Sequence, residues 1–240
     1  MITAMFFAHI TGDFILQTDR LAHWKATCQK GVLTHGLIVL LVTWLFSLPF
    51  DRGWWPWVLF IGLSHTAIDS SQLWLAQHTP RPGPSPAALI RFCVDQALHF
   101  TIILIALTAS GYLPLANPAG AILAALQQTP LLTLLMGYAF LLMPAWVIVK
   151  ILVYSLVGGS PPNFAGGTDK YIGMLERLLI TTFVLLGQYV LVPLVTLPRL
   201  LAEGREVRNR QQTNLYVAEL LASVTLAVIT GLGIRLLAGG

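Results

Sequence analysis

Three apolar segments of this chain each carry a histidine and an aspartate four residues apart. The pairs are His9 with Asp13, His65 with Asp69 and, in reverse order, Asp95 with His99. In a helix, residues i and i+4 lie on one face, about 6 Å apart along the axis, so each pair forms one polar stripe. An ionisable pair inside an apolar helix is costly unless something binds it. The repeated spacing therefore predicts that the helices pack with their polar stripes facing one another.

The low charge content indicates an integral membrane protein. Hydrophobic residues make up 56% of the 240 residues and charged residues only 10%, whereas soluble domains carry about 25% charged residues. Several hydrophobic segments approach the ~20 residues that a membrane-spanning helix needs. We place them at residues 2–18, 31–49, 54–76, 88–111, 130–157, 171–198 and 214–237. The sequence thus predicts an all-α fold, a polytopic transmembrane bundle of about seven helices.

The distribution of basic residues predicts the orientation of the chain in the membrane. The connections 19–30 and 77–91 lie on one side and carry Lys and Arg residues, so the positive-inside rule makes that side cytoplasmic and the amino terminus external. Simple alternation then puts the arginine-rich connection 199–213 outside, against the rule. A hairpin that turns back at Pro144 would remove this conflict. Simple alternation is retained because it brings three later charged residues to the depth of the aspartates.

Depth in the membrane gives the polar residues a layered arrangement. Counted from the expected cytoplasmic ends of their helices, the three aspartates lie at similar depth and the three paired histidines lie one turn deeper. The reversed order of Asp95 and His99 is what antiparallel packing requires. His35, on the segment 31–49, lies level with the aspartates. Four helices are thus expected to bring histidine nitrogens and carboxylate oxygens together.

This mixture of side chains is typical of a transition-metal site. Histidine nitrogen with carboxylate oxygen suits zinc, iron or manganese, whereas oxygen ligands alone would indicate magnesium or calcium. We predict one or two divalent ions, zinc above iron or manganese, held by residues 1–111 of a single transmembrane domain that spans 1–240, with 130–240 as accessory helices. The predicted metal ligands are His9, Asp13, His65, Asp69, Asp95 and His99.

Neighbouring polar residues extend the same stripes. His35 is expected to act as a further ligand or as a general base. Gln17 follows Asp13 by four residues, and Arg91 precedes Asp95 by four, so both are expected to orient ligands or substrate. Lys25 is expected to guard the entrance of the site.

Lys150, Glu176 and Arg177 are the buried charges expected in the second half of the chain. Under simple alternation all three reach the depth of the aspartates. We hypothesise that they face the metal cavity, where Lys150 or Arg177 would receive an anionic group of the substrate and Glu176 would hold one of them in place. The alternative, favoured for these three residues, is a closed ion-pair network that only fixes helix packing.

The motifs resemble those of DUF 3307, a family of bacterial membrane proteins of unknown function. The resemblance rests on His9-x-x-x-Asp13-Phe14-x-Leu16-Gln17, Lys25, His35, His65-x-x-x-Asp69 and Asp95-Gln96-x-x-His99. Residues 166–177 (GGTDKYIGMLER) resemble the longer members of the family. It spans most of the chain and implies a multi-pass protein of the bacterial cytoplasmic (inner) membrane. The family brings no activity with it.

The predicted site favours a metal-dependent integral membrane enzyme. Its chemistry is expected to be hydrolytic, on a lipid-linked or small amphiphilic substrate that can bear phosphate. A transporter or exporter of a divalent transition metal with the same residues is the alternative, and a membrane protein whose metal only pins its helices together is a third interpretation. Membrane lipid is the expected partner. The chain has no basic run typical of nucleic-acid binders, so no nucleic-acid partner is expected.

Overall fold

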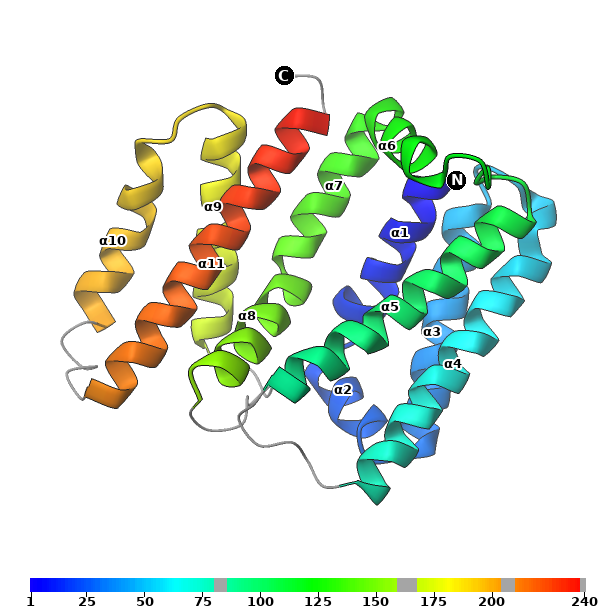
Figure 1. The fold of residues 1–240 in the computed structure, drawn as a ribbon, viewed down its shortest axis with the longest axis horizontal. Helices are drawn as coiled ribbons and strands as arrows, with labels where there is room; N and C mark the ends of the chain where they lie inside the picture. The colour runs from blue at the N-terminus through cyan, green and yellow to red at the C-terminus, as the bar shows by residue number, and fades with distance from the viewer. Residues whose placement is uncertain (80–85, 159–167, 204–209, 238–240) are drawn as a thin grey trace. The chain divides into compact units, whose positions relative to one another are not determined.

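The computed structural model describes residues 1–79, 86–158, 168–203 and 210–237, and every regular element in these ranges is a helix. The expected all-α class is therefore confirmed. Contacts between Cα atoms group the chain into two compact units, Met1–Arg81 with Arg91–Met136 and Pro82–Ile90 with Gly137–Gly240. Figure 1 shows the helices in chain order by colour.

The first unit combines short elements with three long helices. In chain order its elements are α1 (Ile2–Ile10), η1 (Thr11–Ile15), α2 (Asp19–Lys25), α3 (Gln29–Ser47), η2 (Arg52–Trp54), α4 (Trp55–His78), α5 (Pro86–Ala109) from Arg91 onward, α6 (Pro118–Gln128) and the first part of α7 (Pro130–Leu141). The short helices α2 and α6 each begin at a side-chain cap. The Thr18 side chain accepts a hydrogen bond from Leu21 N at 3.3 Å, and the Asn117 side chain accepts one from Gly120 N at 2.9 Å.

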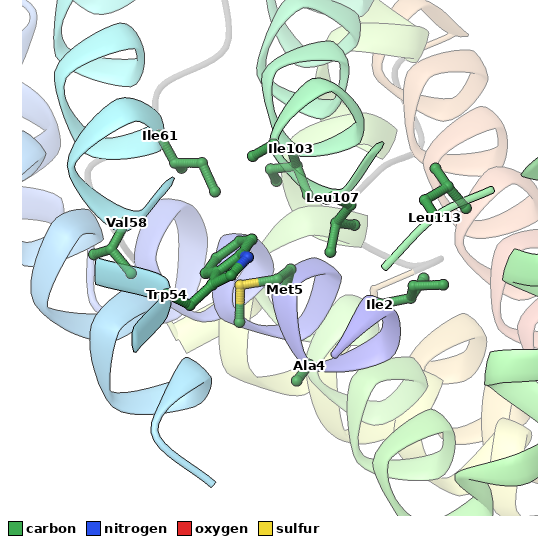
Figure 2. Close-up of a cluster of buried hydrophobic side chains, with 10 residues drawn as sticks. Ile2, Ala4, Met5, Trp54, Val58, Ile61, Ile103, Leu107 and Leu113 are labelled. Carbon is green, nitrogen blue, oxygen red and sulfur yellow. The ribbon is translucent and has the colours of Figure 1, made fainter. Parts of the chain in front are cut away.

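An apolar cluster holds α1, α4 and α5 together in this unit (Figure 2). Met5, Ile61 and Ile103 belong to this cluster and are buried to 4% exposure or less. Each of them lies four residues, about one helical turn, from a histidine of the His/Asp pairs. Burial of the apolar layer at ~25 cal/mol per Å² therefore fixes three helices at the level where their polar residues meet.

The interface between α3 and α4 is unusually close at Gly36. A Cβ atom at this position would overlap Thr66 Oγ1 on α4 and lie 3.1 Å from Thr66 Cβ. His35 is the next residue along α3, and its Nε2 lies 3.1 Å from Nε2 of His65 on α4. The glycine therefore sets the helix spacing that brings the two histidine rings into contact.

Replacing Gly36 with alanine is expected to push α3 away from α4. Forcing an extra methyl group into a packed interface costs about 1–3 kcal/mol, so the thermal midpoint, followed by tryptophan fluorescence in detergent, should fall. Gly233→Ala is the matched control, because a Cβ at that position on a helix of the second unit meets nothing within 4 Å. Equal midpoints for the two variants would contradict this account of the α3–α4 contact.

The second unit contains the end of α7 together with α8 (Met143–Leu156), α9 (Thr168–Leu185), α10 (Leu191–Glu203) and α11 (Arg210–Leu237). A core of Leu141, Ile180, Val184 and Ala227 joins α7, α9 and α11. These side chains are between 0% and 1% exposed, so the unit has a packed interior of its own.

Three helices of the described residues are long and apolar enough to cross a membrane, and they are α3, α5 and the part of α11 at Thr213–Leu237. The pair α6 and α7, bent by 98°, gives a fourth span if it is counted as one. The helices agree with the expected membrane protein. The expected count of seven spans is not supported.

Two expected spans are interrupted by local backbone features. The segment 130–157 breaks at Leu142, which has ψ −107° and precedes Pro144 near the start of α8, and in Figure 1 α8 runs on beyond α7. Proline has no backbone N–H and clashes with the preceding turn of a helix. The segment 171–198 breaks at Gly187, which has a φ of 72° that favours glycine.

Two other expected spans do not have the length or the hydropathy of a membrane-spanning helix. The first apolar stretch, Ile2–Ile15, is shorter than a spanning helix. Helix α4 (Trp55–His78) has 24 residues but is not among the helices that are apolar enough to cross a membrane. Polar residues such as His65, Asp69 and Gln72 lower its hydropathy. The connections expected at 19–30 and 112–129 contain the helices α2 and α6.

Candidate metal centre

A widened turn between α1 and α2 positions Asp13. The hydrogen bond from Leu16 N to Thr11 O, at 2.9 Å, spans five residues and makes η1 a π-helical turn. Such single turns inside helices are frequent at functional sites. Gly12 lets this turn approach α3 closely, because a Cβ there would lie 3.3 Å from Val39 Cα. Asp13, 5% exposed, thereby reaches His35 on α3.

Asp13, His35 and His65 form the first group of potential ligands. His35 Nε2 lies 2.9 Å from Asp13 Oδ1, His65 Nε2 lies 3.1 Å from His35 Nε2, and His65 Nε2 lies 3.7 Å from Asp13 Oδ1. All three side chains are buried, and His35 is not exposed at all. The contact between two ring nitrogens requires a proton between them, and metal binding releases such protons.

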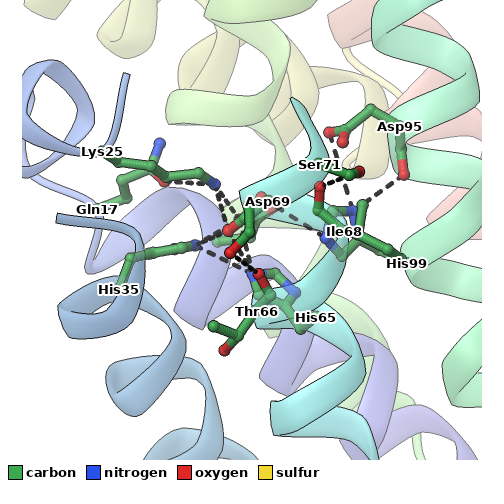
Figure 3. Close-up of polar contacts among 12 residues, drawn as sticks. Gln17, Lys25, His35, His65, Thr66, Ile68, Asp69, Ser71, Asp95 and His99 are labelled. Atoms are coloured by element: carbon green, nitrogen blue, oxygen red, sulfur yellow. Dashed lines mark hydrogen bonds and ion pairs between the residues drawn. The ribbon is translucent and has the colours of Figure 1, made fainter. Parts of the chain in front are cut away.

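His65, Asp69 and His99 form the second group, which shares His65 with the first (Figure 3). His65 Nε2 lies 3.3 Å from Asp69 Oδ2, and His99 Nε2 lies 3.8 Å from Asp69 Oδ1. The ligand atoms of each group all lie within 4.8 Å of one another. His65 therefore belongs to both halves of one continuous cluster.

The tautomer of His99 suits metal binding. Its Nδ1 donates a hydrogen bond to the backbone carbonyl of Asp95 at 2.9 Å, and a carbonyl oxygen can only accept. In a neutral ring this leaves a lone pair on Nε2, which is buried and has no hydrogen-bond partner in the described structure. Metal-binding histidines are commonly oriented in this way by a hydrogen bond from the other ring nitrogen.

The spacing of the first group fits a tetrahedral ion. Atoms bound to one zinc ion at 2.0–2.1 Å in tetrahedral geometry lie ~3.3 Å apart. The three separations among Asp13, His35 and His65 are 2.9, 3.1 and 3.7 Å. Small shifts of side chains would therefore complete three corners of a tetrahedron, and the fourth corner would remain for water, substrate or a further ligand.

His9 and Gln96 lie beside the two ligand groups and contact them. The His9 ring stacks on His99 with centroids 5.7 Å apart, and its Nε2 lies 3.3 Å from Gln96 Oε1. Gln96 in turn donates through Nε2 to Asp13 at 3.3 Å and to Asp95 at 3.2 Å. A cavity of about 10 Å³ lies between the rings of His9, His65 and His99 and the apolar layer, which is room for about one water molecule.

Lys25 reaches directly into the cluster from the end of α2. Its Nζ lies 2.8 Å from Asp69 Oδ2 and 3.7 Å from Asp13 Oδ1, and it donates to Gln17 Oε1 at 3.3 Å. Burial by itself would lower the pKa of the Lys25 ammonium, but Asp13 and Asp69 outweigh this effect and raise the pKa. Lys25 therefore stays charged at neutral pH and offsets two buried carboxylates.

Replacing Lys25 with methionine is expected to destabilise the metal-free protein more than the zinc-saturated protein. Removing one partner of a buried ion pair costs roughly 3 kcal/mol, and a bound cation would supply the missing charge. The increase in thermal midpoint on adding zinc should therefore be larger in the variant. Lys30→Met, at an exposed position of α3, is the control. The same zinc-dependent increase in both variants would argue against competition between Lys25 and a metal ion.

The other predicted residues of the first unit lie at the edge of the cluster. The Asp95 side chain is 23% exposed and lies 3.8 Å from His99 Nδ1, so it belongs to neither ligand group. Arg91 donates to Thr79 Oγ1 at 3.1 Å, and Gln17 contacts the cluster through Lys25. Gln96 was not among the predicted site residues, although it stands beside Asp95 in the motif that carries the family resemblance.

Lys150, Glu176 and Arg177 belong to the second unit and have partners there. Lys150 Nζ lies 2.8 Å from both carboxylate oxygens of Glu219, and Arg199 Nη1 lies 3.1 Å from Glu176 Oε2. The sequence did not single out Glu219, which is the only acidic residue of the segment 214–237, and it counted Arg199 only among the arginines of the connection 199–213. That Lys150, Glu176 and Arg177 face the metal cavity remains a prediction.

Comparison with known proteins identifies one family. Residues 1–119 match the family described as "Protein of unknown function (DUF3307)". This range contains all the His/Asp motifs and ends after α5, so it covers less of the chain than the resemblance implied. No curated protein and no solved structure matches the chain.

Proposed function

We propose that the chain, which belongs to the DUF 3307 family through residues 1–119, is a metal-dependent integral membrane enzyme. We infer a hydrolytic reaction on a lipid-linked or small amphiphilic substrate that bears phosphate. The family description names no activity, so the proposal rests on the chemistry of the site.

The observation that carries the proposal is the pair of buried ligand groups joined at His65. Isolated ionisable groups are expensive in an apolar bundle, and this cluster gathers four histidines and two aspartates, namely His9, Asp13, His35, His65, Asp69 and His99, each no more than 5% exposed. The mixed nitrogen and oxygen donors favour zinc, with iron or manganese as alternatives, and one or two ions. A bound zinc ion would lower the pKa of a coordinated water to about 7 and polarise a phosphoryl oxygen.

Residues in and beside the two ligand groups suit the roles of general base, support of the ligands and contact with the substrate. His35 would serve as a ligand or general base, and Gln96 would hold His9, Asp13 and Asp95 in place. Asp13 and Asp69, which pair with the ammonium group of Lys25 in this structure, would help to hold the metal ion, and Lys25 would then be without these two ion pairs. It would then be available to bind a substrate phosphate, which Lys recognises as a point charge.

One observation favours the alternative of a divalent-metal transporter. The partly exposed Asp95 connects through Gln96 to the buried Asp13, and Lys25 is an internal cation that a metal ion would displace. A series of carboxylates from the surface to a buried site is what an ion pathway needs.

Two assays on the purified chain separate the proposals. The enzyme is expected to release inorganic phosphate from mixed micelles of phosphatidic acid, lysophosphatidic acid or polyprenyl pyrophosphate, in a zinc-dependent reaction that His65→Ala abolishes. In sealed proteoliposomes it should show no net zinc flux. Zinc flux that His65→Ala removes, without phosphate release from any of these substrates, would overturn the enzyme in favour of the transporter.

We also infer that the protein lies in the bacterial cytoplasmic membrane with its amino terminus outside, so that α2 and the end of α4 face the cytoplasm. Single cysteines at the exposed positions His23 and Gln77 should resist an impermeant maleimide in intact cells, in a background without Cys28 and Cys93. A cysteine at Leu115, 84% exposed between α5 and α6, should be labelled. The opposite labelling pattern would invert the topology and leave the metal proposal standing.

A further inference from the structure

One nitrogen atom of His65 faces both groups of potential metal ligands. In the first group, His65 Nε2 lies 3.1 Å from His35 Nε2 and 3.7 Å from Asp13 Oδ1. In the second group, the same nitrogen lies 3.3 Å from Asp69 Oδ2. A histidine ligand is neutral when it binds a metal ion, and a neutral imidazole has only one nitrogen with a free lone pair. His65 therefore serves an ion in one group at a time.

The charges of the ligand groups also favour a single divalent ion. The carboxylates within the two groups are those of Asp13 and Asp69, which together carry two negative charges. One divalent ion balances both, in agreement with the proposed displacement of Lys25. A second divalent ion would leave two positive charges unbalanced inside an apolar bundle, where an uncompensated charge is costly. Asp95, whose side chain is 23% exposed at the edge of the cluster, would offset only one of them.

The second group is as ready to receive an ion as the first. His99 Nε2 lies 3.8 Å from Asp69 Oδ1, and the ring centroids of His65 and His99 are 4.2 Å apart. The lone pair on His99 Nε2 is buried and has no hydrogen-bond partner in the described structure, so it is available to a metal ion. Figure 3 shows His35 and His99 on opposite sides of His65. The two groups are thus neighbouring positions that meet at this residue.

We propose that the cluster holds one zinc ion, which occupies either of two neighbouring positions that share His65. The first position uses Asp13 and His35, and the second uses Asp69 and His99. In each position three protein ligands hold the ion and leave the fourth corner open for water, as in catalytic zinc sites. This inference rests on the proposed function, which it narrows to one ion per chain that is bound by two histidines and one carboxylate at a time.

Two positions that share a ligand make the effects of substitutions non-additive. Loss of His35 leaves the second position complete, and loss of His99 leaves the first. Each single alanine variant should therefore bind zinc less than about tenfold more weakly than wild type, whereas loss of an outer partner of an ordinary metal site costs about 10–100-fold. The double variant His35→Ala/His99→Ala leaves neither position complete, so its affinity should fall by more than about 100-fold.

The test uses the full-length chain in detergent with zinc alone as the probe. Competition with a chromophoric chelator measures the affinities, and plasma mass spectrometry after gel filtration should count one zinc ion per chain in wild type. X-ray absorption spectroscopy should find two histidine ligands on this ion, both in wild type and in each single variant. Asp95→Asn is the control, because Asp95 belongs to neither ligand group, and it should bind zinc about as tightly as wild type.

The thermal midpoint without zinc reports whether each variant folds, and His35→Gln or His99→Gln replaces an alanine variant that does not. Two zinc ions per chain, or three or more histidine ligands on one ion, would overturn the two-position site. So would a loss of more than about tenfold in either folded single variant. These outcomes leave the metal-dependent enzyme standing, whereas folded wild type that takes up no zinc would overturn both proposals.

Discussion

Replacing His65 with alanine is expected to reduce the affinity of the purified protein for zinc by more than about 100-fold. His65 is the ligand candidate that both groups share, since its Nε2 lies 3.1 Å from His35 Nε2 and 3.3 Å from Asp69 Oδ2. Loss of an outer partner of a metal site already costs about 10–100-fold, so loss of a shared ligand should cost more. A competition titration against a chromophoric chelator measures the affinity directly.

His78→Ala provides the control for this experiment. His78 is on the same helix, α4, but it is exposed and bonds only to the Trp74 carbonyl among the hydrogen bonds of the described residues. Its zinc affinity should equal that of wild type. Similar affinities for His65→Ala and wild type, with the variant folded, would mean that any metal binds outside the His/Asp cluster.

Replacing Arg177 with methionine is expected to lower the free energy of unfolding strongly. The side chain of Arg177 supplies donors to Leu141 O and Leu142 O at the break between α7 and α8, and to Ser223 Oγ on α11. Each hydrogen bond from a charged donor contributes about 1.5–3 kcal/mol, and buried carbonyls left without a donor add a penalty. We expect a loss of more than about 3 kcal/mol in unfolding free energy, measured by denaturation in mixed micelles.

Arg235→Met is the control for that loss, because Arg235 is exposed on α11 and donates to the Tyr189 hydroxyl at 2.7 Å. Surface substitutions usually change stability by less than about 0.5 kcal/mol. An Arg177 variant as stable as this control would contradict the assignment of Arg177 as the residue that satisfies the broken helix.

Local spacing explains how much of the site was predictable. His/Asp pairs at i and i+4 define a face on their own helix, and matching depth predicts which faces meet, so the convergence of His9, His65 and His99 follows from the sequence. The roles of Gln96 and Lys25 in the same cluster depend on tertiary contacts. Gln96 contacts His9 and Asp13, which lie 87 and 83 residues away in the chain, and no local pattern specifies such a pairing.

The number of spans was less predictable because hydropathy does not detect breaks in a helix. The stretch 130–157 is apolar except for a few residues such as Lys150, yet it breaks near Pro144 into α7 and α8, where Arg177 binds the free carbonyl groups. Gly187, which has a φ of 72°, separates α9 from α10. The caps at Thr18 and Asn117 do mark the start of α2 and α6, and weight given to them would have predicted helices in both connections.

The metal content of the wild-type protein shows whether the buried His/Asp cluster binds a transition metal. Plasma mass spectrometry on protein purified in detergent without chelator, before and after incubation with zinc, iron or manganese, counts the ions per chain. We expect one or two transition-metal ions per chain, bound by the nitrogen and oxygen donors of the buried His/Asp cluster. Protein that is folded, carries no metal and takes up none of the three would contradict it.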